Sequence, residues 1–156
     1  MDSPQLPQKL YDAGRQYFSQ LKELGLRPEG LMWVWDNTRS QFILMMIWSG
    51  IDRVGPLAVA KMLFKAYRAS ALTQDIDPFT VHVRSNKEVL AARMNDAIAT
   101  GADEYQLLRK DREHPDEFLY QWAKPWIYTL SEKRRSAVDT SRDWKRFSGN
   151  IEKLAA

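Results

Sequence analysis

The chain has 156 residues, of which 44% are hydrophobic and 28% are charged. That length fits a single domain, and that composition excludes both a disordered chain and a protein made only of membrane spans. Cysteine is absent and there are two histidines, which excludes disulfide frameworks, thiolate metal sites and cysteine nucleophiles. We therefore expect no metal ion and no cofactor.

The net charge is mildly positive, at +3. Residues 1–108 carry 12 basic and 12 acidic side chains, so the whole excess comes from residues 109–156, with 11 basic and 8 acidic. This balance is milder than that of a dedicated nucleic-acid-binding protein. No basic and apolar leader is recognised at the start, and the longest apolar run, residues 42–48, is far shorter than the roughly 20 residues of a membrane span. We expect a soluble, cytoplasmic protein without membrane contacts.

The first third of the chain predicts a helix and a β-hairpin. Pro7 and Gly25 bracket an amphipathic pattern that predicts a helix over residues 8–24. Two aromatic-rich and β-branched runs, residues 31–35 and 42–48, flank a short polar stretch and predict the hairpin. The second run is apolar throughout, which is typical of a central strand covered on both faces.

The middle of the chain predicts a helix, a strand and a second helix. Pro56 opens the first helix, and its apolar residues recur at helical spacing: Leu57, Ala60, Leu63, Phe64, Tyr67 and Ala71. Residues 79–84 alternate as a half-buried strand does, with Phe79, Val81 and Val83 on one side. Ser85 and Glu88 form a capping box, which predicts a helix ending near Gly101.

After Gly101, the sequence predicts helices over residues 103–110, 115–125 and 140–154. We therefore expect the α+β class: a small, mostly antiparallel sheet built from the hairpin 31–48 and the strand 79–84, several helices, and a helical C-terminal region. Residues 1–130 are expected to form one domain. Residues 131–156 would be a polar connector and an amphipathic helix packed on that domain or on a second subunit.

The last helix carries a narrow apolar stripe that predicts a docking surface. Its members are Trp144, Phe147, Ile151 and Leu154. A stripe of this kind packs either on the body of the same chain or on a partner.

No nucleotide-binding, zinc-protease, calcium-binding or serine-hydrolase motif is present. The candidate acid–base groups are Glu29, Asp36, Asp52, Asp75, Asp77 and His82. For the aspartates we favour turn and cap roles, because their side chains bond the local backbone. For His82 we favour a solvated surface position. An enzyme would require two of Asp36, Asp52 and His82 in one pocket, so we predict no catalytic residues.

Two basic groups are candidates for binding anions or nucleic acid. Lys61, Lys65 and Arg68 share one predicted helix face, and no acidic residue occurs between Arg53 and Gln74. The second group lies in the C-terminal part and surrounds Trp144: Lys133, Arg134, Arg135, Lys145 and Arg146. Solvated surface is the simpler explanation for the first group, and a subunit-docking helix explains the second.

These observations favour a non-catalytic binding or assembly domain that acts through protein–protein contacts, with itself or with another protein. Nucleic-acid binding through phosphate contacts at the basic groups is the alternative, and a small-molecule enzyme is the third hypothesis. The hairpin tryptophans Trp33, Trp35 and Trp48 are expected in the core, although a groove for an apolar ligand would also use them.

Overall fold

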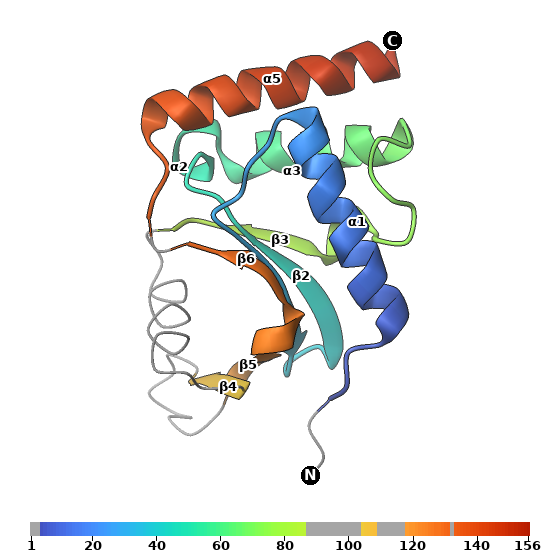
Figure 1. Cartoon of the computed structure of the whole chain (residues 1–156), viewed down its shortest axis with the longest axis vertical. Helices are drawn as coiled ribbons and strands as arrows, with labels where there is room; N and C mark the ends of the chain where they lie inside the picture. The colour runs from blue at the N-terminus through green and yellow to red at the C-terminus, as the bar shows by residue number, and fades with distance from the viewer. Residues whose placement is uncertain (1–3, 87–103, 109–117, 132) are drawn as a thin grey trace.

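The computed structural model describes residues 4–86, 104–108, 118–131 and 133–156 (Figure 1). Its helices are α1 (Gln8–Leu24), α2 (Ile51–Val54), α3 (Pro56–Arg68) and α5 (Ala137–Ala155). Its strands are β1 (Gly30–Asp36), β2 (Gln41–Ile47), β3 (Val81–Arg84), β4 (Glu104–Leu108), β5 (Phe118–Ala123) and β6 (Ile127–Leu130). Two 3-10 turns, η1 (Pro78–Thr80) and η2 (Lys124–Trp126), precede β3 and β6. The fold belongs to the α+β class, as the sequence predicted.

The sheet has six strands in the order β3-β2-β1-β5-β4, with β6 also paired to β1. β1 is central because it has β2 on one side and both β5 and β6 on the other. Its pairs are antiparallel, whereas β3 lies parallel to β2. A parallel neighbour requires a crossover connection, and α2 and α3 supply it. The predicted small, mostly antiparallel sheet is therefore confirmed, with one parallel pair at β3.

Hydrophobic residues are buried on both faces of the sheet, as the all-apolar run of β2 predicted. On one face, Leu31, Trp33, Leu44 and Met46 pack against α1, α3 and α5. On the other face, Met32, Val34, Ile43 and Met45 form a second core with Tyr120 and Trp122 of β5. The alternation along β1 and β2 follows from the two-residue period of a strand. Trp33 and Trp48 are therefore core residues, as expected.

α1 is held on the sheet by a polar contact as well as by apolar packing. The Trp33 indole N–H donates to the Leu10 carbonyl at 3.0 Å and to the Tyr128 hydroxyl at 2.9 Å. Tyr128 in turn donates to the Tyr11 carbonyl at 2.6 Å. Burial raises the pKa of Tyr128 to about 12, so the hydroxyl keeps the proton it donates. Gly14 permits this close approach, because an added Cβ would overlap the Tyr128 hydroxyl.

Two predicted helices are wrong. Residues 103–110 contain β4, and residues 115–125 contain β5, while β6 was not predicted at all. Tyr120 and Trp122 are both buried with Gln121 between them, which is the two-residue period of a strand. The local pattern that suggested helices is a weak preference, and sheet pairing overrides it, because β5 pairs with β1 and β4 pairs with β5. The helix predicted from Ser85 to Gly101 lies outside the described residues.

Two predicted boundaries also move. β3 begins at Val81, because Asp77 accepts a bond from the Phe79 amide at 2.9 Å and closes the turn η1 instead. α5 begins at Ala137 rather than at Thr140, because Ser136 accepts a bond from the Asp139 amide and caps the helix there.

Candidate functional site

The candidate aspartates Asp36 and Asp52 both have structural partners. The Asp36 carboxylate accepts bonds from the Thr38 amide, the Thr38 hydroxyl and the Arg39 amide, so it organises the turn between β1 and β2. Asp52, on α2, pairs with Arg134 at 2.9 Å. The two aspartates lie at opposite ends of the hairpin, separated by the roughly 20 Å length of a seven-residue strand.

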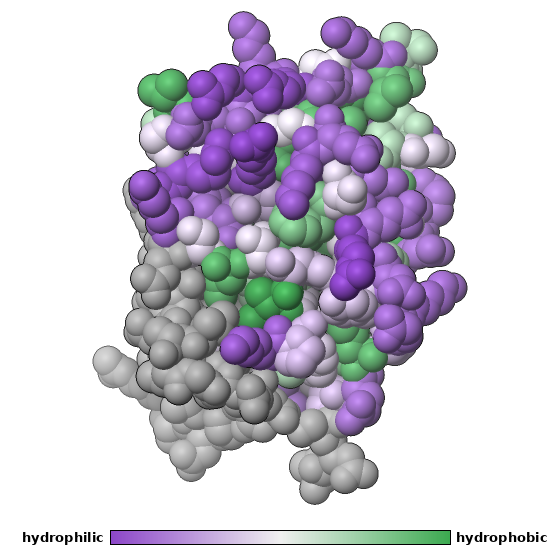
Figure 2. Space-filling view, viewed as in Figure 1, coloured by the Kyte–Doolittle hydropathy of each residue, from purple (hydrophilic) through white to green (hydrophobic). Residues whose placement is uncertain are grey.

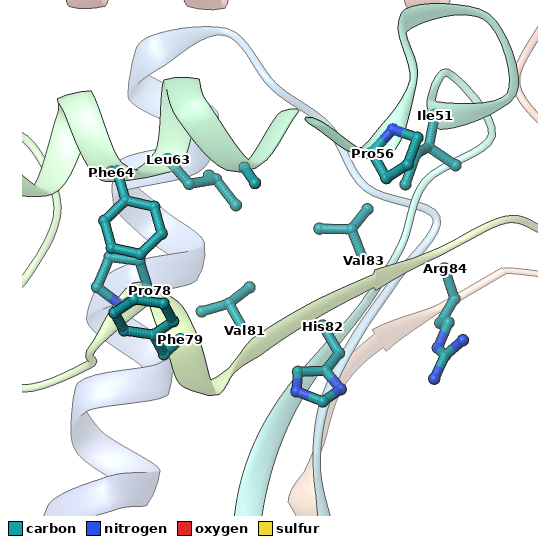
Figure 3. Close-up of a pocket in the computed structure, with 11 residues that line it drawn as sticks. Ile51, Pro56, Leu63, Phe64, Pro78, Phe79, Val81, His82, Val83 and Arg84 are labelled. Carbon is teal, nitrogen blue, oxygen red and sulfur yellow. The ribbon is translucent and has the colours of Figure 1, made fainter. Parts of the chain in front are cut away.

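His82 lies on the face of β3 that points away from α3, beside Arg84 (Figure 3). Its pKa is lowered from 6.5 chiefly by burial, then by the positive charges of Arg39 and Arg84, while Asp36 opposes the shift. The imidazole is therefore partly buried and neutral, not the solvated group that the sequence suggested. Asp52 lies beyond the far end of the hairpin, so it does not join the other two residues. Asp36 is near enough for its charge to act on His82, but its carboxylate is engaged in the turn at Thr38 and Arg39, and it does not line the hollow that His82 lines.

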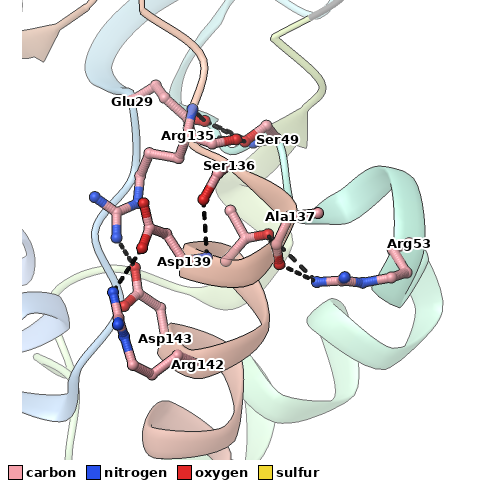
Figure 4. Close-up of polar contacts among 10 residues, drawn as sticks. Glu29, Ser49, Arg53, Arg135, Ser136, Ala137, Asp139, Arg142 and Asp143 are labelled. Carbon is pink, nitrogen blue, oxygen red and sulfur yellow. Dashed lines mark hydrogen bonds and ion pairs between the residues drawn. The ribbon is translucent and has the colours of Figure 1, made fainter.

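Glu29 has a structural role. Its buried carboxylate accepts bonds from the amide and hydroxyl of Ser49 and from the Arg135 amide, at 3.1 Å for the last (Figure 4). It therefore joins the start of β1, the end of β2 and the connector that leads into α5. A carboxylate surrounded by donors in this way satisfies buried amides.

Three of the eight predicted anion-binding cations are engaged in ion pairs. Lys65 contacts Glu152 of α5 at 2.5 Å, Arg134 contacts Asp52, and Arg135 contacts the buried Asp143. In the described part of the chain the other five have no ion pair, and all five are exposed: Lys61, Arg68, Lys133, Lys145 and Arg146. The second basic group is thus partly neutralised, Arg134 by Asp52 of α2 and Arg135 by Asp143 of α5.

The predicted docking stripe of α5 divides between the inside and the outside of the molecule. Phe147 and Ile151 are fully buried in the core formed with α1 and α3. Trp144 is half-buried and packs on Trp48, with ring centroids 5.7 Å apart. Leu154 is 59% exposed. The body of this chain therefore covers most of the stripe.

α3 buries a different set of residues from the one that the sequence spacing grouped together. Its buried residues are Val59, Leu63 and Ala66, whereas the spacing grouped Leu57 and Phe64 with Leu63. Leu57 is 66% exposed. A helix that is apolar on more than one face does not reveal which face it buries. That same excess of apolar residues was the sequence signal for a second, outward-facing apolar surface.

Two adjoining hollows lie along this outward surface. The first, of about 410 Å³, lies between α3 and β3 and is walled by Leu63, Phe64, Val81 and Val83 (Figure 3). The second, of about 610 Å³, lies over α3 and includes Leu57. Phe64 and Phe79 line both.

The side chains along these hollows form what we call the α3–η1 surface: Leu57, Phe64 and Phe79, flanked by Lys61, Lys65 and Arg68. Phe79 is 77% exposed, and its ring meets that of Phe64 edge to face at 4.8 Å between centroids. The remaining large exposed hydrophobic residues of the described chain, Val138 and Leu154, lie near opposite ends of α5. Val138 also lines a hollow beside cations, but no second exposed large hydrophobic residue of the described chain lies there. Those of the α3–η1 surface are grouped, and cations border them.

The face of the molecule that α1 and α5 form is different in character. Figure 2 shows hydrophilic side chains over most of it, with hydrophobic ones in small separate areas. Grouped exposed apolar side chains mark binding surfaces, whereas scattered ones are ordinary. The α3–η1 surface is therefore the candidate functional site.

Comparison with protein-family models, curated proteins and solved structures gives no match for this chain. In the described part, no group of three or more potential ligand side chains could hold a metal ion. No helix in that part has the length and apolar character needed to cross a membrane. The α3–η1 surface is therefore the feature from which a function can be proposed.

Proposed function

We propose that this protein is a non-catalytic binding domain whose α3–η1 surface receives an apolar, acidic segment of another protein. One observation carries the proposal: the exposed Leu57 and Phe79 are grouped with Phe64, and cations flank the group. Leaving a side chain of this size in water forgoes about 1.5–3 kcal/mol of burial energy. A partner that covers the group would recover it.

The charges define the kind of partner. Lys61 and Arg68 project from α3 without an ion pair among the described residues, and Lys65 shares its charge with Glu152. Carboxylates on the incoming segment would meet these cations, and complementary charge favours both encounter and orientation. An acidic segment is thus attracted and a basic one is repelled.

Nucleic acid is the less favoured partner. A phosphate-backbone surface is made chiefly of unpaired cations, whereas the centre of this one is apolar and only two of its three cations are unpaired. A small-molecule substrate is disfavoured too, because such pockets hold a few convergent polar groups. His82 and Arg84 also line the first hollow, but their side chains leave β3 on the side opposite its apolar wall (Figure 3).

The test is selection of short random peptides on the purified protein, in parallel with selection of a random oligonucleotide pool. We expect enriched peptides that combine apolar residues with Asp or Glu, and no enriched oligonucleotide. Phe79→Ser and Leu57→Ser should each abolish peptide binding. Val138→Ser and Leu154→Ser are matched controls, since both remove an equally exposed hydrophobic residue elsewhere, and they should bind as the unaltered protein does.

Three outcomes would overturn the proposal. The first is failure to enrich any peptide, and the second is enrichment that survives Phe79→Ser. The third is a homodimer, seen by sedimentation of the free protein, that dissociates in the Phe79→Ser variant, because the occupant would then be a second copy of this chain.

A further inference from the structure

We infer that the partner segment binds as an extended strand that adds to the sheet at the outer edge of β3 and directs alternate side chains into the hollow between β3 and α3. This inference rests on the proposed function and names the conformation and the residue pattern of the partner.

The first support is the position of β3 at the end of the sheet. The Arg84 carbonyl accepts a bond from the Trp48 amide at 2.9 Å, so the peptide groups of Arg84 face β2. Because peptide groups alternate along a strand, the N–H and C=O of Val83 face the outer edge. No described residue pairs with them. An edge of this kind is a template for another strand.

The second support is the direction of the side chains. Val81 and Val83 point toward α3 and form the floor of the first hollow, while Leu63 and Phe64 of α3 form its roof (Figure 3). A strand laid beside β3 directs every second side chain to that same face. Its apolar residues at positions i and i+2 would therefore enter the hollow.

The third support is charge on the other side of β3. Arg84 points away from the hollow and donates to the Tyr120 hydroxyl at 3.3 Å. No carboxylate of the described residues pairs with it, and its buried Nε has no hydrogen-bond partner. The intervening residue of an added strand would face this side, where a carboxylate is favourable. The partner pattern is therefore apolar, acidic, apolar.

A helical partner fits less well. A helix with its side chains is about 10 Å or more across and satisfies its own backbone groups, so it would leave the Val83 edge unpaired beneath it. An extended segment pairs that edge and fills the hollow at once.

The experiment uses the peptides enriched on the unaltered protein, each methylated at one backbone nitrogen in turn. We expect methylation at every second position to weaken binding about tenfold, because the donor facing β3 is lost, and the intervening positions to have little effect. Uniform sensitivity, or none, would overturn the inference. If those peptides still require Phe79, the proposed function survives that result.

Amide hydrogen exchange supplies a second readout on the protein itself. The Val83 amide should exchange rapidly in the free protein and slowly with peptide bound. The neighbouring Arg84 amide, which faces β2, is the matched control and should be protected in both states. A Val83 amide that is already protected in the free protein would mean that the edge is occupied, and would overturn the inference.

Discussion

α1 and α3 cover the same face of the same sheet, yet they differ in how completely their apolar residues are buried. α1 buries Tyr17 and Leu21, and its half-buried Phe18 is covered by the Lys22 ammonium, 3.9 Å from the ring centroid. α3 buries Leu63 but leaves Leu57 66% exposed. The apolar surplus of α3 adds nothing to the stability of this chain, which is why we attribute it to binding.

The two helices also differ in their polar attachment. α1 is fixed by the hydrogen bonds that join Trp33, Tyr128 and the carbonyls of its first turns. α3 is joined to α5 by the solvent-exposed pair Lys65–Glu152, and an exposed ion pair contributes at most about 1 kcal/mol. α1 thus has partly buried polar bonds to the sheet, whereas the polar bond between α3 and α5 is exposed.

Opposite faces of α3 should respond very differently to the same substitution. Leu63→Ala should lower the free energy of unfolding by about 2–5 kcal/mol, because Leu63 is 2% exposed and the change leaves a cavity. Leu57→Ala should alter it by no more than about 0.5 kcal/mol. Urea denaturation measures both. Equal losses would mean that Leu57 belongs to the core and would remove the contrast between the helices.

Two glycine substitutions test the close contact between α1 and the sheet. Gly14→Ala should destabilise the protein by about 1–3 kcal/mol, because the new methyl group overlaps the Tyr128 hydroxyl and comes within 2.6 Å of Trp33 Nε1. Gly149→Ala in α5 is the control, since nothing lies within 4 Å of its added Cβ. Its gain in helix propensity should stabilise the protein by up to about 1 kcal/mol. Thermal unfolding should therefore shift in opposite directions.

The smallest effect concerns pH. The folded protein holds the pKa of His82 below its usual 6.5, through burial first and then Arg39 and Arg84. The unfolded state therefore binds more protons, so the contribution of His82 to stability is complete above about pH 6.5 and declines below it. The urea concentration at the unfolding midpoint should therefore decrease as the pH is lowered below about 6.5. His82→Gln should make this decrease smaller.

Amide exchange measured over the same pH change also tests the contrast between the two helices. Because His82 lies on β3, amide exchange should accelerate in β3 and α3 before it does in α1. Faster exchange in α1 first would contradict the contrast between the two helices.

Local patterns were sufficient for the first half of the fold. The helix over residues 8–24 matches α1 at both ends, and the hairpin runs 31–35 and 42–48 agree with β1 and β2 within one residue. In these segments the hydrophobic period, the capping residues and the tertiary environment favour the same structure. The residues between 104 and 130 lacked that agreement. β5 and β6 depend on pairing with β1, which is distant in sequence, and β4 depends in turn on pairing with β5.

The candidate site escaped prediction for a different reason. Lys61, Lys65 and Arg68 were identified from their spacing, and they do line the α3–η1 surface. Leu57 and Phe79 were placed among the apolar residues of their predicted helix and strand, because a sequence marks a side chain as apolar without saying whether anything covers it. Only the rotation of α3 about its axis and the turn at Asp77 decide that.

The position of β1 has a consequence for synthesis of the chain. β2 follows it at once, but β5 begins at residue 118, 82 residues after the end of β1 at residue 36. At about 5–20 residues per second, the nascent chain exposes the second edge of its central strand for roughly 4–16 seconds. Contacts so distant in sequence also slow folding. During translation this open edge is the part of the chain most exposed to pairing with a neighbouring nascent chain.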